Sequence, residues 1–182
     1  MKHVFIFLTS GFEEIEAICL IDVIRRAEID ATTVSISNDY MVTGAHGISV
    51  KADKLFEETD FSSGDLLALP GGMPGASNLN AHTGLKDLLK QYVASGKKVA
   101  AICAAPLVLG GLGLLEGKNA TAYPGFETML TGAQFVKTDV VIDGNIITGR
   151  GPGFAVDFAL AIVSQLAGEE KANEVAAGML LS

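Results

Sequence analysis

The stretch from residue 97 to residue 109, KKVAAICAAPLVL, sets a short apolar run directly before a helical one. Residues 99–102 follow Gly96 and two lysines, so a buried parallel strand fits this run better than so short a helix. Pro106 stands just after Cys103, and the first turn of a helix tolerates proline because its amide hydrogens lack partners anyway. Cys103 is therefore predicted to lie at a sharp strand-to-helix turn.

The chemistry of Cys103 is left open by this segment alone. A thiol at such a turn would face free backbone N–H groups and the positive end of a helix, and both favour the thiolate. A cysteine can equally pack as a small core hydrophobe. The turn thus offers either a nucleophile or a structural residue.

Outward from this stretch, strand patterns alternate with helix patterns. Strands are predicted at residues 4–8, 31–36, 65–69 and 120–123, and at 140–142 and 145–148 around Asp143-Gly144, a dipeptide typical of hairpins. Residues 40–50 predict two short extended pieces, and helices are predicted from residues 11–13 to about 28, and at 83–94, 154–167 and 171–181. This alternation indicates an α/β protein with a mostly parallel sheet. Because no linker or repeat interrupts it, residues 1–182 are predicted to form a single domain.

Composition narrows the class of protein. Lys and Arg total 13 against 21 Asp and Glu, and this formal net charge of −8 argues against nucleic acid as a partner, since phosphate contacts need a basic surface. Two isolated cysteines form no disulfide framework, so a reducing cytoplasmic setting is expected. The N-terminus has too short an apolar run for a signal peptide or a membrane span, so no membrane partner is expected.

A carboxylate heads the inner face of the first predicted helix. Ser10 and Glu13 have the spacing of a capping box at its start. Glu16 then falls on one face with apolar residues at helical spacing, namely Leu20, Val23 and Ala27. A carboxylate there is costly unless it is paired or protonated. Glu16 is predicted to point into the same crevice as Cys103, at the carboxyl edge of the sheet, or alternatively to help cap its own helix.

Other chemistries find little support in the sequence. Three scattered histidines and two isolated cysteines show no metal-ligand spacing, and neither a dinucleotide fingerprint nor a phosphate loop is present. Glycines at residues 71–75 follow a predicted strand, where their N–H groups would stabilise an oxyanion or simply punctuate the chain. What remains is a nucleophile, Cys103, with Glu16 as proton partner and the amides near Gly72 and Ala104 as the oxyanion site.

Four motifs in this order carry a resemblance: GFEEIE at residues 11–16, LPGGMPG at 69–75, AICAAP at 101–106 and RGPG at 150–153. The chain resembles the ThiJ/PfpI family nearly end to end, and within it the group of the parkinsonism-associated deglycase (DJ-one) and its bacterial relatives. The resemblance implies a flavodoxin-like three-layer α/β/α sandwich with a mostly parallel central sheet, usually a homodimer. The apolar pair Ile15 and Ile18, on the side of the first helix that should be polar, fits a homodimer formed through that helix.

The resemblance also implies roles for residues. Cys103 would be the nucleophile, Glu16 the protonated carboxyl that hydrogen-bonds its thiolate, and Gly72 with Ala104 the oxyanion amides. Glu13 and Arg26 match further pocket or dimer-side positions of the family. Arg150, in the RGPG motif, is a further pocket candidate.

Two positions depart from the family pattern. Tyr123 stands where many relatives carry a histidine, so no Cys-His pair can form there and amide hydrolysis of the protease type is not favoured. His46 stands roughly where close relatives carry an arginine, and it would either donate to a substrate carbonyl or stay solvated. Both are retained as pocket candidates.

The resemblance therefore implies a cysteine-dependent enzyme that needs no cofactor and no metal. The expected activity is that of a glyoxalase III or deglycase acting on a small carbonyl substrate, a methylglyoxal-type α-oxoaldehyde or its early adducts, in defence against carbonyl and oxidative stress. The alternative is a redox-sensing stress protein or chaperone that uses oxidation of Cys103 and turns over little substrate.

Overall fold

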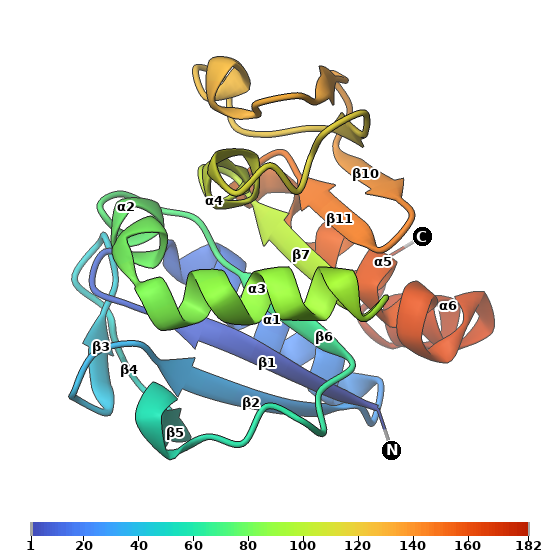
Figure 1. Cartoon of the computed structure of the whole chain (residues 1–182). Coiled ribbons are helices and arrows are strands. Elements are labelled where there is room, and N and C mark those ends of the chain that lie inside the picture. Colours follow the sequence, from blue (N-terminus) through green and yellow to red (C-terminus); the bar gives the residue numbers. More distant parts are fainter. Residues whose placement is uncertain (1, 182) are drawn as a thin grey trace.

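A seven-stranded sheet runs through the middle of the computed structural model, which describes residues 2–181 (Figure 1). Its strands are β1 (His3–Leu8), β2 (Asp30–Ser35), β5 (Lys54–Leu55), β6 (Leu66–Leu69), β7 (Lys98–Ile102), β10 (Val140–Asp143) and β11 (Ile146–Gly149). They lie in the order β10-β11-β7-β6-β1-β2-β5, and every neighbouring pair is parallel except the hairpin β10–β11. The sheet is therefore mostly parallel, as the sequence predicts.

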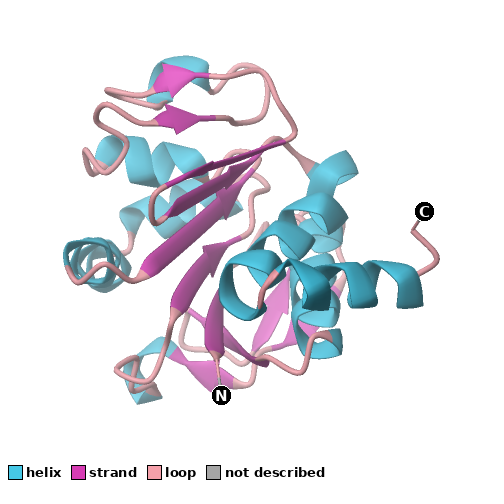
Figure 2. Ribbon diagram, turned by 90° about the vertical axis from the view of Figure 1, so that its right-hand side faces the viewer, coloured by secondary structure: helices cyan, strands magenta, loops and turns pink. Residues whose placement is uncertain are grey.

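Helices cover both faces of this sheet (Figures 1 and 2). One face carries α1 (Glu14–Arg26), α5 (Ala155–Ala167) and α6 (Glu169–Gly178), and the other carries α2 (Gly75–Ala81), α3 (Thr83–Ala94) and α4 (Pro106–Gly111). Strand β1 serves both cores because its side chains alternate: Ile6 packs with the α1 and α5 side, and Phe7 packs with the α3 side. This arrangement confirms the predicted α/β/α sandwich.

Two small two-stranded sheets lie outside the central one. The hairpin of β3 (Met41–Thr43) and β4 (Ser49–Lys51) matches the extended pieces predicted over residues 40–50. The other pairs β8 (Asn119–Ala120) with β9 (Gln134–Phe135). The predicted strand at 120–123 is thus wrong beyond Ala120, because Thr121 N donates to the Thr148 hydroxyl and Tyr123 N donates to Cys103 O instead of joining a ladder.

The start of α1 differs from the predicted capping box. Glu13 is itself the N-cap residue, with extended φ and ψ and a carboxylate that accepts from Ile15 N at 3.3 Å. Ser10 lies too early, because the chain turns at Gly11 with φ +80 before the helix begins. The helix ends at Arg26, slightly earlier than predicted, and Glu28 adopts φ 59, a backbone conformation that stops a helix.

The carboxyl ends of β6, β7 and β11 lie side by side, since Leu69 pairs with Ala101 and Gly149 pairs with Ile102. Loops that follow parallel strands meet at this edge, and it is where ligands bind in open α/β sheets. As for membranes, none of the helices within residues 2–181 combines the length and apolar character that crossing a bilayer requires.

Candidate active site

Cys103 lies between the end of β7 and the first residue of α4, at the strand-to-helix turn that the sequence predicts. Its N–H donates to Gly149 O and its carbonyl accepts from Tyr123 N, both at 2.9 Å, so its backbone is tied to the end of β11 and to the loop that contains Tyr123. Its φ of 65 lies in the left-handed region, which costs a residue with a side chain about 1–3 kcal/mol. The residue is only 8% exposed. The surroundings therefore hold this cysteine in a fixed and unfavourable conformation.

Glu16, in the first turn of α1, is fully buried. Its Oε2 accepts from Gly71 N at 2.7 Å, so it is not occupied in capping its own helix. Within residues 2–181 its Oε1 has no hydrogen-bond partner of ordinary geometry, and the Cys103 thiol lies beside the carboxyl. A buried carboxyl oxygen without a partner is costly. Glu16 is thus placed to exchange a proton with the thiol or with a bound molecule.

The ionisation of this pair differs from the sequence-based expectation of a stabilised thiolate. Burial, above all, raises the pKa of Glu16 to about 7. Burial and then the neighbouring Glu16 carboxylate raise the pKa of the Cys103 thiol to about 12, although the N–H groups of Gly72 and Ala104 lower it. The sequence pattern showed the turn but not how completely it is buried. Near neutral pH the thiol therefore keeps its proton while Glu16 titrates, and a thiolate forms when the thiol proton moves to the Glu16 carboxylate.

Two glycines after β6 make room for this contact. A Cβ on Gly71 would lie 2.7 Å from Cys103 Cβ and 2.9 Å from Glu16 Oε2, so any side chain there would separate the thiol from the carboxyl. Gly72 adopts φ +87, and a Cβ would clash with the Glu13 backbone nitrogen. The sequence indicated the Gly72 amide, but it gave no sign that Gly71 binds the Glu16 carboxylate.

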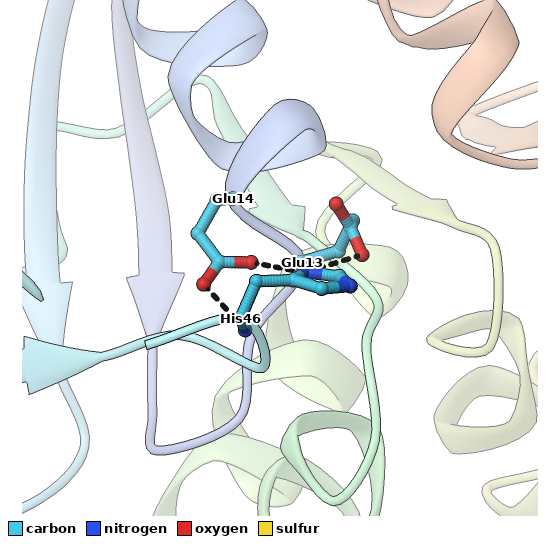
Figure 3. Close-up of side chains that lie close together, drawn as sticks. All are labelled: Glu13, Glu14 and His46. Atoms are coloured by element: carbon cyan, nitrogen blue, oxygen red, sulfur yellow. Dashed lines mark hydrogen bonds and ion pairs between the residues drawn. The ribbon is translucent and has the colours of Figure 1, made fainter. Parts of the chain in front are cut away.

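A second cluster of titratable groups, Glu13, Glu14 and His46, lies at the start of α1 (Figure 3). His46 comes from the β3–β4 loop, and its Nδ1 lies 2.8 Å from Glu14 Oε2 and 3.7 Å from Glu13 Oε2. The His46 backbone N–H also donates to Glu14 Oε1 at 2.7 Å. The hydrogen bond with Glu14 raises the pKa of His46. Burial by itself would raise the pKa of Glu14, but the hydrogen bonds that Glu14 accepts outweigh it, so the pKa of Glu14 is lowered. Glu14, whose role no sequence pattern indicates, therefore binds the β3–β4 hairpin to α1.

Of this cluster, Glu13 is the residue that contacts the loop of Gly71 and acts on Glu16. Its N–H donates to Gly71 O at 3.0 Å, and its charge helps raise the pKa of Glu16. The three residues each offer a ligand atom within 4.8 Å of the others, and the short distance between His46 and Glu14 is that of an ion pair. His46 itself is 68% exposed at its side chain, so it lies at the rim of the site.

Arg150 directly follows β11, on one side of β7, whereas Glu16 binds Gly71, which follows β6 on the other side of β7. Tyr123 and Arg150 line a cavity of about 290 Å³ together with Pro124 and residues 151–154. The Arg150 guanidinium lies 5.9 Å from the centre of the ring of residue 154, a phenylalanine. The fold thus brings both predicted pocket candidates together in one cavity, on segments whose backbone is tied to Cys103.

Arg26 is not brought to the crevice. It is the last residue of α1 and pairs with Asp22 at 2.6 Å, beside a hollow lined by residues of α6. Helices rise 1.5 Å per residue, so the ten positions from Glu16 separate the two by on the order of 15 Å. Within one copy of the chain, the pocket role predicted for Arg26 is therefore wrong, because the family position alone does not say at which end of the helix the crevice opens.

Comparison with known proteins places the chain in a family. Residues 2–165 match the model of the DJ-1/PfpI family. The chain is 43% identical to the protein DJ-1 homolog A of Arabidopsis thaliana over 99% of its own length, but it spans only 47% of that relative. It is 33% identical to a protein of Pyrococcus abyssi named as a deglycase, covering 83% of this chain and 91% of that one.

Among solved structures, the oxidized form of Toxoplasma gondii DJ-1 superposes with a TM-score of 0.96 at 37% identity, covering 100% of both chains. The likeness thus includes the arrangement of the whole sheet and not only the motifs around Cys103. On the family match, these identities and this superposition, the chain belongs to the DJ-1/PfpI family.

Proposed function

We propose that this protein is a cysteine-dependent glyoxalase or deglycase that needs no cofactor and acts on methylglyoxal-type α-oxoaldehydes or their early adducts on amines, in defence against carbonyl and oxidative stress. The observation that carries the proposal is the position of the Cys103 thiol between the Glu16 carboxyl and the N–H groups of Gly72 and Ala104. The deglycase name of the Pyrococcus abyssi relative supports the same class of activity.

The first step would use the proton that the pair shares. Transfer of the thiol proton to Glu16 gives a thiolate, which adds to the aldehyde carbon of methylglyoxal. The aldehyde oxygen takes the proton back from Glu16, and the product is a hemithioacetal on Cys103. The N–H groups of Gly72 and Ala104 would stabilise the negative charge that forms on this oxygen.

The second step is a proton transfer between neighbouring carbons. Glu16, again ionised, removes the hydrogen from the carbon bonded to sulfur, and the adjacent ketone accepts a proton to form an enediol. Return of the proton to the second carbon leaves a thioester of the 2-hydroxy acid. Water then cleaves the thioester, which releases lactate and restores the thiol, so that methylglyoxal and one water give one lactate and a proton.

The test is the rate of methylglyoxal loss and lactate formation in Cys103→Ser and Glu16→Gln. Because the thiol carries the substrate and the carboxyl moves its protons, Cys103→Ser should lose nearly all activity and Glu16→Gln should lose about 10²-fold or more. Cys19→Ser, which changes the other cysteine on α1, is the matched control and should keep the wild-type rate. A Cys103→Ser protein that forms lactate at the wild-type rate would contradict the proposal.

A second function, redox sensing through Cys103, is supported by the groups beside the sulfur that could bind its oxidised form. Oxidation of the thiol adds oxygens that the N–H groups of Gly72 and Ala104, and a protonated Glu16, are placed to bind. With dilute hydrogen peroxide, mass spectrometry should then find sulfinate on Cys103 before Cys19 changes. If Cys19 reacts first and Cys103 resists, the sensor function is wrong.

A further inference from the structure

The cavity of about 290 Å³ is lined by residues of two segments that are hydrogen-bonded to the backbone of Cys103. Tyr123 N donates to Cys103 O, and Cys103 N donates to Gly149 O, the residue before Arg150. Since Gly149 pairs with Ile102 across β11 and β7, Arg150 follows at the position next to Cys103, and neighbouring strands lie about 4.8 Å apart. Two of the cavity's lining segments are therefore joined through the backbone to Cys103, one directly at Tyr123 and one through the residue before Arg150.

The polar side chains that line this cavity have no hydrogen-bond or ion-pair partner within the described part of the chain. Arg150 has no carboxylate paired with its guanidinium among residues 2–181, although it lies over the Phe154 ring. The Tyr123 hydroxyl makes no hydrogen bond within the same residues. Tyr123 is 46% exposed, and its ring lies so near Gly151 that a Cβ there would come within 3.1 Å of it. The cavity thus presents one cation and one hydroxyl with free donors.

Charged side chains are distributed unevenly around the Cys103 thiol. The acidic groups Glu13, Glu14 and Glu16 all lie on the α1 side, whereas Arg150 lies on the β11 side. With a formal net charge of −8, the protein as a whole repels anions, so an anionic molecule would be held only where a local cation offsets this field. Guanidinium groups bind carboxylates and phosphates in a fixed, often bidentate geometry.

We propose that the cavity lined by Tyr123 and Arg150 binds the anionic end of an α-oxoaldehyde that carries a carboxylate or a phosphate, while its aldehyde reacts with Cys103. The proposal rests on the function proposed above and specifies its substrate class. For 4,5-dioxopentanoate, the same steps convert one substrate and one water into 2-hydroxyglutarate and a proton. The cavity lies near the lower end of the volumes of small-molecule sites, roughly 300–1,000 Å³, which suits a short substrate of this kind.

The test compares kcat/KM for three probes: 4,5-dioxopentanoate, the phosphate-bearing 2-oxo-3-phosphooxypropanal, and neutral 2-oxopentanal of matched length. The wild type should prefer at least one anionic probe over the neutral one by about tenfold or more, and the preferred probe identifies carboxylate or phosphate as the ligand. In Arg150→Gln this ratio should fall towards one, and Arg150→Lys should keep part of it. Lys54→Gln removes a cation on β5, at the opposite edge of the sheet, and should leave the ratio unchanged.

The proposal would be wrong if Arg150→Gln kept the wild-type preference for the anionic probe, or if the wild type showed no such preference. A wild type that converts no oxoaldehyde would instead refute the proposed function. In that case a binding measurement decides whether the cavity is an anion site. Calorimetry with 4-oxopentanoate, which lacks the aldehyde, or with inorganic phosphate should show binding to Cys103→Ala that is lost in Cys103→Ala/Arg150→Gln. No binding of either probe to Cys103→Ala would refute the anion site.

Discussion

Glu16 and Cys103 share a proton in a buried site, and the cost of that arrangement depends on pH. The pKa of the Glu16 carboxyl rises from an ordinary value of 4.5 to about 7 in the folded chain, chiefly because burial disfavours its charge. The folded state therefore binds this proton more tightly than the unfolded state. The stability contributed by protonated Glu16 is fully present below pH 4.5 and is lost as the pH rises through about 7.

Replacement of Glu16 by Gln should remove this pH dependence. Each unit of pKa shift is worth about 1.36 kcal/mol, so the free energy of unfolding of the wild type, relative to Glu16→Gln, should fall by about 3 kcal/mol between roughly pH 4.5 and 8. The measurement is urea unfolding across this range, and taking the difference cancels carboxylates common to both proteins, such as Glu14 and Asp53, whose pKa values are lowered. Parallel stability curves for the two proteins would show that folding does not raise the pKa of Glu16.

At the scale of single residues, the sequence predicted which residues meet at the site better than it predicted their ionisation. The motifs and helical spacing placed Glu16, Gly72 and Cys103 together, and the structure agrees. The raised pKa of the thiol could not be foreseen, because it depends on how far loops distant in sequence bury the cysteine. Gly71 was interpreted only as part of a glycine-rich turn, since a contact between its N–H and Glu16 leaves no trace in residue type.

Elements with a regular pattern were predictable and those held by side-chain contacts were not. The helix over residues 83–94 and the hairpin β10–β11 follow from spacing and from Asp143-Gly144, and both agree with the structure. Helix α2 was missed because its glycine-rich start resembles a plain turn. The strand expected at 120–123 stops at Ala120 because the next donors bind Thr148 and Cys103, which lie elsewhere in the sequence.

On the scale of the whole molecule, the outer side of α1 offers an apolar surface for a second copy of the chain. Ile15 and Ile18 are 57% and 45% exposed, although large apolar side chains on a helix usually face the core. We propose that two copies pair through this surface. If the two α1 helices packed antiparallel, the Arg26 end of one copy would lie beside the Glu14 end of the other, which would give Arg26 the dimer-side role that the resemblance implies.

Sedimentation tests this dimer directly. Ile18→Glu places a charge on the proposed interface without touching the core, so it should convert a dimer into a monomer that keeps its helical content. Ile142→Glu, on β10 at one edge of the sheet, changes a residue of similar exposure and should leave the dimer intact. A wild type that sediments as a monomer, or dissociation in both variants, would contradict pairing through α1.

The backbone ties of Cys103 to Gly149 and Tyr123, and of Glu16 to Gly71, also bear on when the protein becomes reactive. These contacts join segments far apart in the chain, so the site has high contact order and forms only after the loops between them close. A nascent chain that has not yet supplied β11 cannot hold Cys103 in its left-handed conformation. During synthesis the thiol would thus titrate as an ordinary cysteine, and proton exchange with Glu16 would begin only with the completed sheet.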